Sequence, residues 1–376
     1  MTLKIVADEN IPHLHALFSA FGKINALPGR KISATDVADA DILLVRSVTS
    51  VSAELLRDSG VRFVGTCTIG TDHLDTDFLT QHNIAFASAP GCNANAVVQY
   101  VVGVLAELDR LHEQANVVVV GGGNVGGRVY DALHALGFHC QVVDPFLPQD
   151  GHRTMSDFDA VFEADIVCVH TPLTTDGPHP TRHMFNQSVL QQLKKNTLLI
   201  NAGRGGAIDN TALLRVLEQR NDLSVVLDVW ENEPDINPSV LAKVNVGSPH
   251  IAGYSLEGRL NGALMIFDAL KHFLIAGGQC DIAGITQAEI AKQAVELQAL
   301  GSPETIAAQT LRETICAVYP VSRDHKHLIE AVKGLPDSFD ALRKNYPQRR
   351  EFSHYRCANV PTAISKKLQS LGFIID

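Results

Sequence analysis

Short apolar runs alternate with helically spaced segments through the first quarter of the chain. The runs at 3–10 (LKIVADEN) and 40–47 (ADILLVRS) are rich in apolar and β-branched residues and end in polar ones, which predicts buried strands. Between them, the segment 12–22 (PHLHALFSAFG) has helical spacing and stops at a glycine. Further strands are predicted at 61–68 and 84–90. This alternation predicts a parallel sheet with helices on both faces.

A long helical segment that starts near residue 94 leads into a second series of strands and helices. The series opens at 115–145 (ANVVVVGGGNVGGRVYDALHALGFHCQVVDP), where a buried strand runs into a glycine-rich turn and then a helix. Four further segments pair a strand with a turn: DIVCVHTPL, TLLINAGRG, SVVLDVWENEP and VNVGSPHIAG. We therefore predict a second doubly wound parallel sheet.

The pattern divides the chain into three domains of overall α/β class. The helix LEGRLNGALMIFDALKHFLIAGG returns the chain to the first domain, which is therefore discontinuous and comprises residues 1–93 with 260–284. Residues 94–259 form the second domain. We expect the first domain to be flavodoxin-like and the second to be Rossmann-like. Residues 285–376 hold helical segments, a basic run and a closing strand-helix-strand pattern, which predicts a smaller C-terminal α+β domain.

Composition and charge narrow the classes of function. The chain is 45% hydrophobic and 19% charged, which is typical of a globular protein with a substantial core. Its net charge of −10 argues against general binding of nucleic acid or anionic membranes, because both need basic surfaces. The seven cysteines are scattered without a C-x-x-C pair, and no apolar run approaches the ~20 residues of a membrane helix. We therefore expect a cytoplasmic protein with no disulfide framework and no metal site.

The glycine-rich turn of the second domain predicts a dinucleotide-binding site. Glycines permit a tight turn and a close approach of the backbone to a pyrophosphate, and the following helix N-terminus offers N–H groups. The next strand ends about 20 residues later in a carboxylate that can accept hydrogen bonds from the ribose hydroxyls and would repel a 2′-phosphate, which favours NAD over NADP. The alternative is a structural turn with a strand-end cap. The residues of this predicted site are Gly121, Gly123, Asn124, Val125, Gly126 and Asp144.

Three later turns carry polar residues at strand ends, where open α/β sheets bind ligands. Arg204 lies in a glycine-rich turn and can hold a carboxylate with two parallel hydrogen bonds. Asp228 and Glu233 follow the next buried strand, and His250 follows a proline. Each residue alone has an ordinary alternative, as a surface ion pair, a cap or a core imidazole. Together, beside a nicotinamide, they form the set needed to oxidise a 2-hydroxy acid, with His250 as the proton carrier.

These motifs, in this order, resemble those of the D-isomer-specific 2-hydroxyacid dehydrogenase family. The likeness covers about residues 1–280 and rests on GGGNVG with Asp144, INAGRG, LDVWENEP and SPHIAG. A finer likeness to one enzyme of the family reaches both termini, through VADENIP, LVRSVTSV, GTCTIGTDHLD, APGCNANAV, SPHIAGYSLEGR and LRKNYPQRREF. The resemblance implies NAD-dependent oxidation of a small phosphorylated 2-hydroxy acid by a cytoplasmic homodimer. It also implies that the first domain binds substrate and the second binds NAD.

The resemblance assigns roles to individual residues. It makes Arg204 the substrate-binding arginine, Glu233 the acid that orients the imidazole, and His250 the acid/base. The other residues with implied contacts are Asp144, Thr171, Asp228 and Gly253 for NAD, and Ser47, Thr68 and Tyr254 for substrate.

Three expectations go beyond these assignments. Many relatives carry Ala, Ser or Cys where this chain has Gly203, which predicts a more flexible turn before the arginine. Arg46 is a candidate ligand for the substrate phosphate, with an ion pair to Asp8 or Glu9 as the alternative. The basic run at 342–352 is a second candidate, although such runs are usually solvated. We expect the last domain mainly to form the dimer, with some of its arginines near the partner's site.

Two other functions are compatible with the sequence. One is a different dehydrogenase of the same family, such as one acting on 3-phosphoglycerate. The other is a non-catalytic NAD(H)-sensing scaffold that uses this fold to bind partner proteins. The first rival would carry a different C-terminal module, and the second needs the glycine-rich turn but no turnover.

Overall fold

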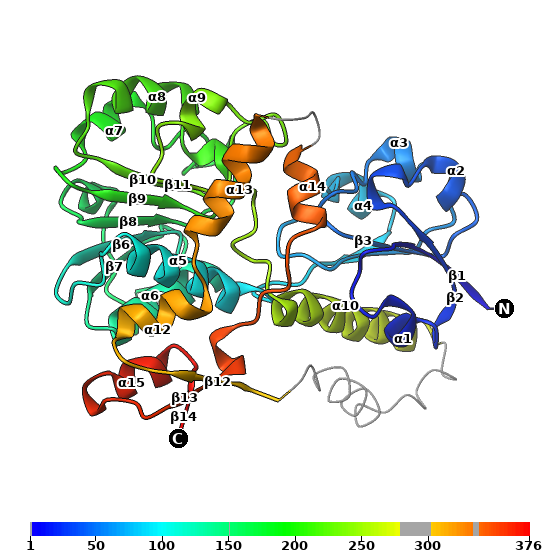
Figure 1. Ribbon diagram of the computed structural model, residues 1–376. Helices are drawn as coiled ribbons and strands as arrows, with labels where there is room; N and C mark the ends of the chain where they lie inside the picture. The colour runs from blue at the N-terminus through cyan, green and yellow to red at the C-terminus, as the bar shows by residue number, and fades with distance from the viewer. Residues whose placement is uncertain (1, 150, 279–301, 334–337) are drawn as a thin grey trace. The chain divides into compact units, whose positions relative to one another are not determined.

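The computed structural model describes residues 2–149, 151–278, 302–333 and 338–376 (Figure 1). The chain forms two compact units. The first comprises Met1–Asn93 and Leu256–Ser302, and the second comprises Ala94–Ser255 and Pro303–Asp376. The predicted boundary at 284/285 lies outside the described residues.

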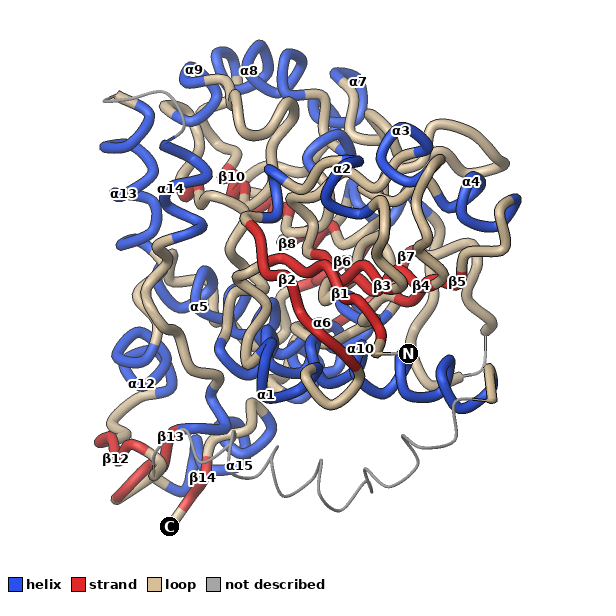
Figure 2. The backbone as a smooth tube through the Cα atoms, turned by 90° about the vertical axis from the view of Figure 1, so that its right-hand side faces the viewer, coloured by secondary structure: helices blue, strands red, loops and turns tan. Residues whose placement is uncertain are grey.

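The first unit is built on a five-stranded parallel sheet in the order β2-β1-β3-β4-β5, which is the flavodoxin-like order (Figure 2). One face is covered by α1 and α10, through residues such as Phe18 and Phe267, and the other by α2, α3 and α4. The strands are β1 (Leu3–Asp8), β2 (Gly22–Leu27), β3 (Ile42–Val45), β4 (Phe63–Thr66) and β5 (Ala85–Ala87). The helices are α1 (Leu14–Phe18), α2 (Ala34–Val37), α3 (Ala53–Leu56), α4 (Thr76–Gln81) and α10 (Leu256–Ala276).

The second unit is built on a six-stranded parallel sheet in the order β11-β10-β9-β8-β6-β7. Both faces are buried, which explains why its strands are continuously apolar. Within β6, Val117 and Val119 face α5 and α6, whereas Val118 and Val120 face α7, α8 and α9. The strands are β6 (Asn116–Val120), β7 (His139–Val143), β8 (Ile166–Val169), β9 (Leu198–Asn201), β10 (Ser224–Leu227) and β11 (Val246–Gly247). The helices are α5 (Ala94–Glu107), α6 (Asn124–Ala135), α7 (Gln187–Gln192), α8 (Asn210–Gln219) and α9 (Pro238–Leu241).

The C-terminal segment belongs to the same compact unit as this second sheet. It packs along α5, where Arg312 Nε donates to the carbonyl of Ala106 (2.8 Å) and the Ser322 amide donates to Glu107 Oε2 (2.7 Å). It adds a small parallel sheet in the order β12-β13-β14, near the chain's C-terminus (Figure 2). Its elements are β12 (Glu304–Ala307), α12 (Leu311–Val318), α13 (Ser322–Val332), α14 (Ser338–Lys344), β13 (Tyr355–Ala358), α15 (Thr362–Ser370) and β14 (Ile374–Ile375).

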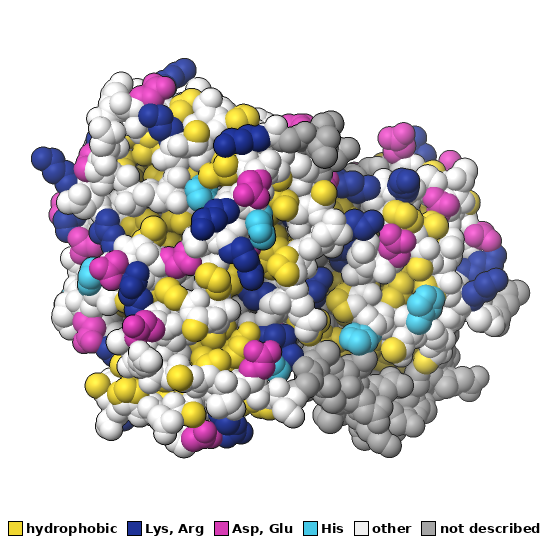
Figure 3. Space-filling model, in the orientation of Figure 1, with side chains coloured by type: hydrophobic (Ala, Val, Ile, Leu, Met, Phe, Trp, Pro, Cys, Tyr) yellow, Lys and Arg dark blue, Asp and Glu magenta, His cyan; other side chains and the backbone are white. Residues whose placement is uncertain are grey.

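The predicted fold class is confirmed: two doubly wound parallel sheets and a smaller α+β segment. Strand β2 is an element that the apolar pattern does not predict, because it is an edge strand with alternate residues exposed. Among the described residues, no helix is long and apolar enough to cross a bilayer. Acidic and basic side chains are interspersed over the face seen in Figure 3.

Candidate active site

The glycine-rich turn joins β6 to α6 at the edge of the second sheet. Gly121 has a φ of +89°, a conformation that favours glycine, and its amide donates to the carbonyl of Val143 (2.9 Å). Gly126 lies so close to this turn that a Cβ there would sit 1.8 Å from the Gly121 oxygen. The opposite holds at Gly123, the N-cap of α6, where a Cβ would meet nothing within 4 Å. The turn therefore packs tightly on its protein side and leaves space at the N-terminus of the helix.

Replacing Gly126 with alanine is expected to destabilise the protein by about 1–3 kcal/mol, because the added methyl group overlaps backbone that is itself held by the sheet. The urea midpoint of unfolding measures this effect. Gly123→Ala is the matched control, and we expect its midpoint to stay close to that of the parent chain. Equal midpoints for the two variants would contradict the close approach of helix and turn.

Asp144 follows β7 directly, beside this turn. Its Oδ2 accepts a hydrogen bond from the Gly122 amide (2.9 Å) and its Oδ1 accepts one from the Phe146 amide (3.0 Å). At the neighbouring strand end, the buried Oγ1 of Thr171 has no hydrogen-bond partner among the described residues. Open space at the helix N-terminus, a fixed carboxylate and an unpartnered hydroxyl fit a dinucleotide.

Arg204 lies in a turn that the side chain of Asn201 holds. Asn201 Oδ1 accepts from the Gly203 amide (3.1 Å), and its Nδ2 donates to the Arg204 carbonyl (3.0 Å). A Cβ at Gly203 would sit 3.0 Å from the Cα of His170, so the turn packs closely against the end of β8. Arg204 Nη1 donates to the Gly203 carbonyl (2.9 Å), and its side chain is half-buried. The turn is therefore held by the Asn201 side chain and by close packing against the end of β8.

The Glu233 and His250 side chains form a hydrogen-bonded ion pair. His250 Nδ1 and Glu233 Oε2 are 2.7 Å apart, and Glu233 Oε1 accepts from the Trp230 amide (2.8 Å). Burial acts to raise the pKa of Glu233, but the charge of His250 and the hydrogen bonds outweigh it and hold that pKa below its usual value. An ionised Glu233 requires a proton on Nδ1, which leaves Nε2 as the atom that can take up a proton from a ligand. The imidazole is 34% exposed, enough to meet one.

Asp228 organises the turn that presents the imidazole, which we call the His250 turn (residues 248–255). Its carboxylate is fully buried and accepts from Ser248 Oγ (2.6 Å) and from the amides of Ile251 (2.8 Å) and Ala252 (2.9 Å). Its own carbonyl accepts from the His250 amide (2.7 Å). Burial raises the pKa of Asp228, with the donors and His250 acting against that rise. His250 itself has a φ of +56°, so these bonds hold a backbone conformation that few residues adopt.

Gly253 and Tyr254 lie in the same turn, where the Tyr254 amide donates to the carbonyl of Ile251 (2.8 Å). The second unit therefore brings together Arg204, Asp228, Glu233, His250, Gly253 and Tyr254 with the glycine-rich turn, all at the carboxyl ends of its strands.

The remaining predicted site residues belong to the first unit. Arg46 and Ser47 follow β3, and Thr68 follows the adjacent strand β4, so the three share one edge of that sheet. Arg46 Nε donates to Asp8 Oδ2 (2.9 Å), and Asp8 is fully buried at the end of β1. The ion-pair alternative for this arginine is the arrangement in the structure. Thr68 Oγ1 lies 2.8 Å from Thr66 Oγ1, in hydrogen-bond contact.

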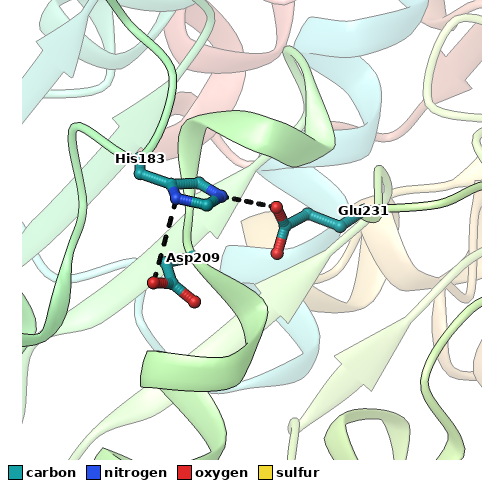
Figure 4. Close-up of side chains that lie close together, drawn as sticks. All are labelled: His183, Asp209 and Glu231. Carbon is teal, nitrogen blue, oxygen red and sulfur yellow. Dashed lines mark hydrogen bonds and ion pairs between the residues drawn. The ribbon is translucent and has the colours of Figure 1, made fainter.

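A second histidine, His183, lies near the strand ends of the second unit's sheet, between two carboxylates (Figure 4). His183 Nε2 is 2.6 Å from Glu231 Oε1, and its Nδ1 is 3.9 Å from Asp209 Oδ2. Glu231 Oε2 also accepts from the Asn210 amide (2.8 Å), and Asp209 caps α8. The two ring nitrogens face different carboxylates, so the cluster ties three segments together. One of them carries Glu231, two residues from Glu233.

Sequence reasoning missed the residues that hold the site rather than form it. Asn201 and Ser248 are examples, and each stands in a motif that was singled out for another residue. The sequence signal for both is a polar residue at the end of a buried strand, because Asn201 ends β9 and Ser248 directly follows β11. The fully buried Trp230 also contributes, since its Nε1 donates to the carbonyl of Ser248 (2.9 Å).

Comparisons with known proteins identify the family of the chain. Residues 105–252 match the family model described as D-isomer specific 2-hydroxyacid dehydrogenase, NAD binding domain, which confirms NAD as the predicted cofactor. Residues 293–372 match a domain of unknown function, DUF3410. A 3-phosphoglycerate dehydrogenase from Entamoeba histolytica with bound NAD⁺ has a similar fold, with a TM-score of 0.64, 20% identity, and coverage of 74% of this chain and 97% of that one.

Full-length relatives are much more similar in sequence. The chain is 52% identical to an erythronate-4-phosphate dehydrogenase of Saccharophagus degradans over 375 residues, which is 99% of each chain. It is 50% identical to an erythronate-4-phosphate dehydrogenase of Teredinibacter turnerae, over 100% of this chain and 99% of the relative. The chain belongs, together with these enzymes, to the D-isomer specific 2-hydroxyacid dehydrogenase family.

Proposed function

We propose that the protein oxidises 4-phospho-D-erythronate to 2-oxo-3-hydroxy-4-phosphobutanoate with NAD, a step of pyridoxal 5′-phosphate biosynthesis. The observation that carries the proposal is the Glu233–His250 pair, which lies with Arg204 at the same sheet edge as the NAD-binding turn. The names of the full-length relatives support the substrate. We further propose that the enzyme is a cytoplasmic homodimer whose C-terminal domain takes part in the dimer.

The chain's own residues account for the proton chemistry. Arg204 binds the C1 carboxylate with its planar, permanently charged guanidinium group. His250 accepts the proton of the C2 hydroxyl at Nε2, because Nδ1 is engaged by Glu233. Glu233 then stabilises the imidazolium ion that forms. Bound NAD supplies the acceptor for the hydride that leaves C2.

The cofactor would be held on the second unit. The glycine-rich turn and helix α6 provide the pyrophosphate site, and the Asp144 carboxylate accepts hydrogen bonds from the ribose hydroxyls. The residues proposed for NAD are Gly121, Gly123, Asn124, Val125, Gly126, Asp144, Thr171, Asp228 and Gly253. The Asp228 carboxylate already accepts three hydrogen bonds from the protein, so we assign it to NAD mainly through the turn that it holds.

The remaining substrate contacts are assigned to both units. Ser47, Thr68 and Tyr254 are proposed to bind the polar groups of the four-carbon chain. Arg46 supplies positive charge for the phosphate, and its ion pair with Asp8 fixes the direction of its guanidinium group. A cation already paired with a buried carboxylate attracts an anion less strongly than an unpaired one, so Arg46 is a partial rather than a sufficient phosphate ligand.

The test is formation of NADH, followed by absorbance, from NAD and 4-phospho-D-erythronate in mildly alkaline buffer with a carbonyl trap. We expect turnover with this substrate and not with 3-phosphoglycerate or D-lactate, and much slower turnover with NADP because of Asp144. Preference for 3-phosphoglycerate would leave the family membership intact and overturn the substrate. Binding of NAD without turnover of any of the three acids would favour the NAD(H)-sensing scaffold.

A further inference from the structure

The His250 turn is held from outside by a stretch of the C-terminal segment of the same chain. Arg349 is fully buried and donates through Nη2 to the carbonyl of Ala252, in the middle of the turn. Glu351 Oε1 accepts from Ser255 Oγ (2.7 Å) at the end of the turn, and both residues are buried. Two buried polar contacts between segments about a hundred residues apart fix the turn against the C-terminal segment.

Aromatic contacts continue the same surface. Arg349 stacks on the ring of Tyr319, with its guanidinium carbon 4.5 Å from the ring centroid. Tyr346 packs edge-on against Tyr254, with ring centroids 6.0 Å apart. Tyr346 is anchored in turn, because its hydroxyl donates to the buried Asp324 (2.8 Å). These residues come from α13 and from the segments that follow α12 and α14, and they form a wall behind the turn.

Arg343, in α14, adds a cation to this wall and lies against Tyr254, a residue of the His250 turn. Its side chain is only 11% exposed, and its guanidinium carbon lies 5.7 Å from the Tyr254 ring centroid. Its ion pair with Asp340 is long, at 3.7 Å, and its Nε has no hydrogen-bond partner within the described parts of the chain. The cation is thus nearly buried and incompletely neutralised by its own helix.

The charges that face Glu233 act in a definite direction. Burial acts to lower the pKa of Arg343, but Tyr254, Glu233 and Asp340 outweigh it and raise that pKa. Arg343 reciprocally helps to lower the pKa of Glu233, after the larger effect of His250. The charged groups that act on Glu233 are therefore His250 and, more weakly, Arg343, and His250 also acts on Asp228. Arg343 and the protonated imidazole compete for the same carboxylate.

We propose that Arg343 is a positioning residue of this active site. In this proposal, the C-terminal domain fixes the His250 turn of its own chain, and the positive charge of Arg343 partly offsets the negative charge of Glu233. This inference rests on the proposed function, because it takes His250 as the acid/base. It assigns the C-terminal region, which matches a domain of unknown function, a specific role in catalysis in addition to its proposed role in the dimer.

The sign of the effect follows from the competition. Without the Arg343 cation, the Glu233 carboxylate stabilises the imidazolium ion more strongly. The oxidation requires a neutral His250, so its activity rises as the imidazole loses its proton. Removing the cation is therefore expected to move the acid limb of kcat/KM to higher pH.

The experiment compares Arg343→Met, which keeps the apolar stem, with Arg343→Lys, which keeps the charge. The pH dependence of kcat/KM is measured on the full-length enzyme. Lys326→Met is the matched control, because Lys326 is an exposed cation of α13 in the same domain. The His250 signal is also titrated by NMR, with His250→Asn used to assign it. That readout needs no substrate.

We expect Arg343→Met to move both midpoints upward, Arg343→Lys to restore them, and Lys326→Met to leave them unchanged. Unchanged midpoints in a folded Arg343→Met protein would overturn the proposal. If thermal melting shows that the methionine variant does not fold, Arg343→Gln is titrated in its place, with the same criterion. A wild-type enzyme inactive on 4-phospho-D-erythronate would remove the proposed function, whereas the NMR titration would still decide whether Arg343 acts on the histidine.

Discussion

Replacing His250 with asparagine is expected to lower kcat by about 10²–10⁴-fold, because the reaction loses the group that accepts the hydroxyl proton. Asparagine is the suitable substitute, since it tolerates the positive φ of this position better than most residues. The steady-state rate of NADH formation at saturating substrate measures the loss. The affinity for NAD, measured by fluorescence titration, should change little.

Two controls separate the chemistry from the fold. His327→Asn removes an exposed histidine of α13 and is expected to retain the full rate. The unfolding midpoint of His250→Asn should stay close to that of the parent chain, because the bonds made by Asp228 involve the backbone around position 250. A variant that keeps more than a tenth of the parent kcat would exclude His250 as the acid/base.

The second large effect is structural. Asp228→Ala is expected to lower the free energy of unfolding by about 3–5 kcal/mol, because a buried hydroxyl and two buried amides lose their shared acceptor. Activity should be lost as well, since the His250 turn loses its internal support. Urea denaturation, followed by tryptophan fluorescence, measures the change through the single tryptophan, Trp230, which lies in the same region.

Asp235→Ala provides the comparison for this second effect. Asp235 lies in the same loop but is exposed, so its removal should change the unfolding free energy by less than about 0.5 kcal/mol. A fully stable Asp228→Ala protein would mean that the turn is held by the C-terminal wall alone. That outcome would shift the structural role from Asp228 to Arg349 and Glu351.

The two large sheets and the candidate site residues can be predicted from the sequence because both depend on local patterns. Strands buried on both faces, such as β6, are continuously apolar, and the glycine-rich turn has its own spacing. Arg204, Glu233 and His250 are recognisable because strand ends share one edge of a parallel sheet. Strand β2 is not predicted in this way, because Lys23 and Asn25 are exposed and none of its residues is fully buried.

The wall behind the His250 turn depends on contacts that no local pattern encodes. Arg343 and Arg349 stand in a basic run, and such runs usually indicate a solvated surface. In the structure one is nearly buried and the other fully buried, each against a residue of a turn about ninety residues earlier in the chain. Their role comes from tertiary packing, which a single sequence does not reveal.

Helix α5 shows that the NAD-binding sheet and the C-terminal segment are one module. Every residue of α5 except Asn95 and Glu107 is buried, and its outer side meets Tyr319, which lies 3.1 Å from the Cβ position of Gly103. A helix that is apolar all round cannot tolerate water on one side. Exchange of the 94–255 segment between relatives would therefore expose a long apolar surface of α5 unless the matching C-terminal segment were exchanged as well. In protein engineering, residues 94–255 and 303–376 should be exchanged together.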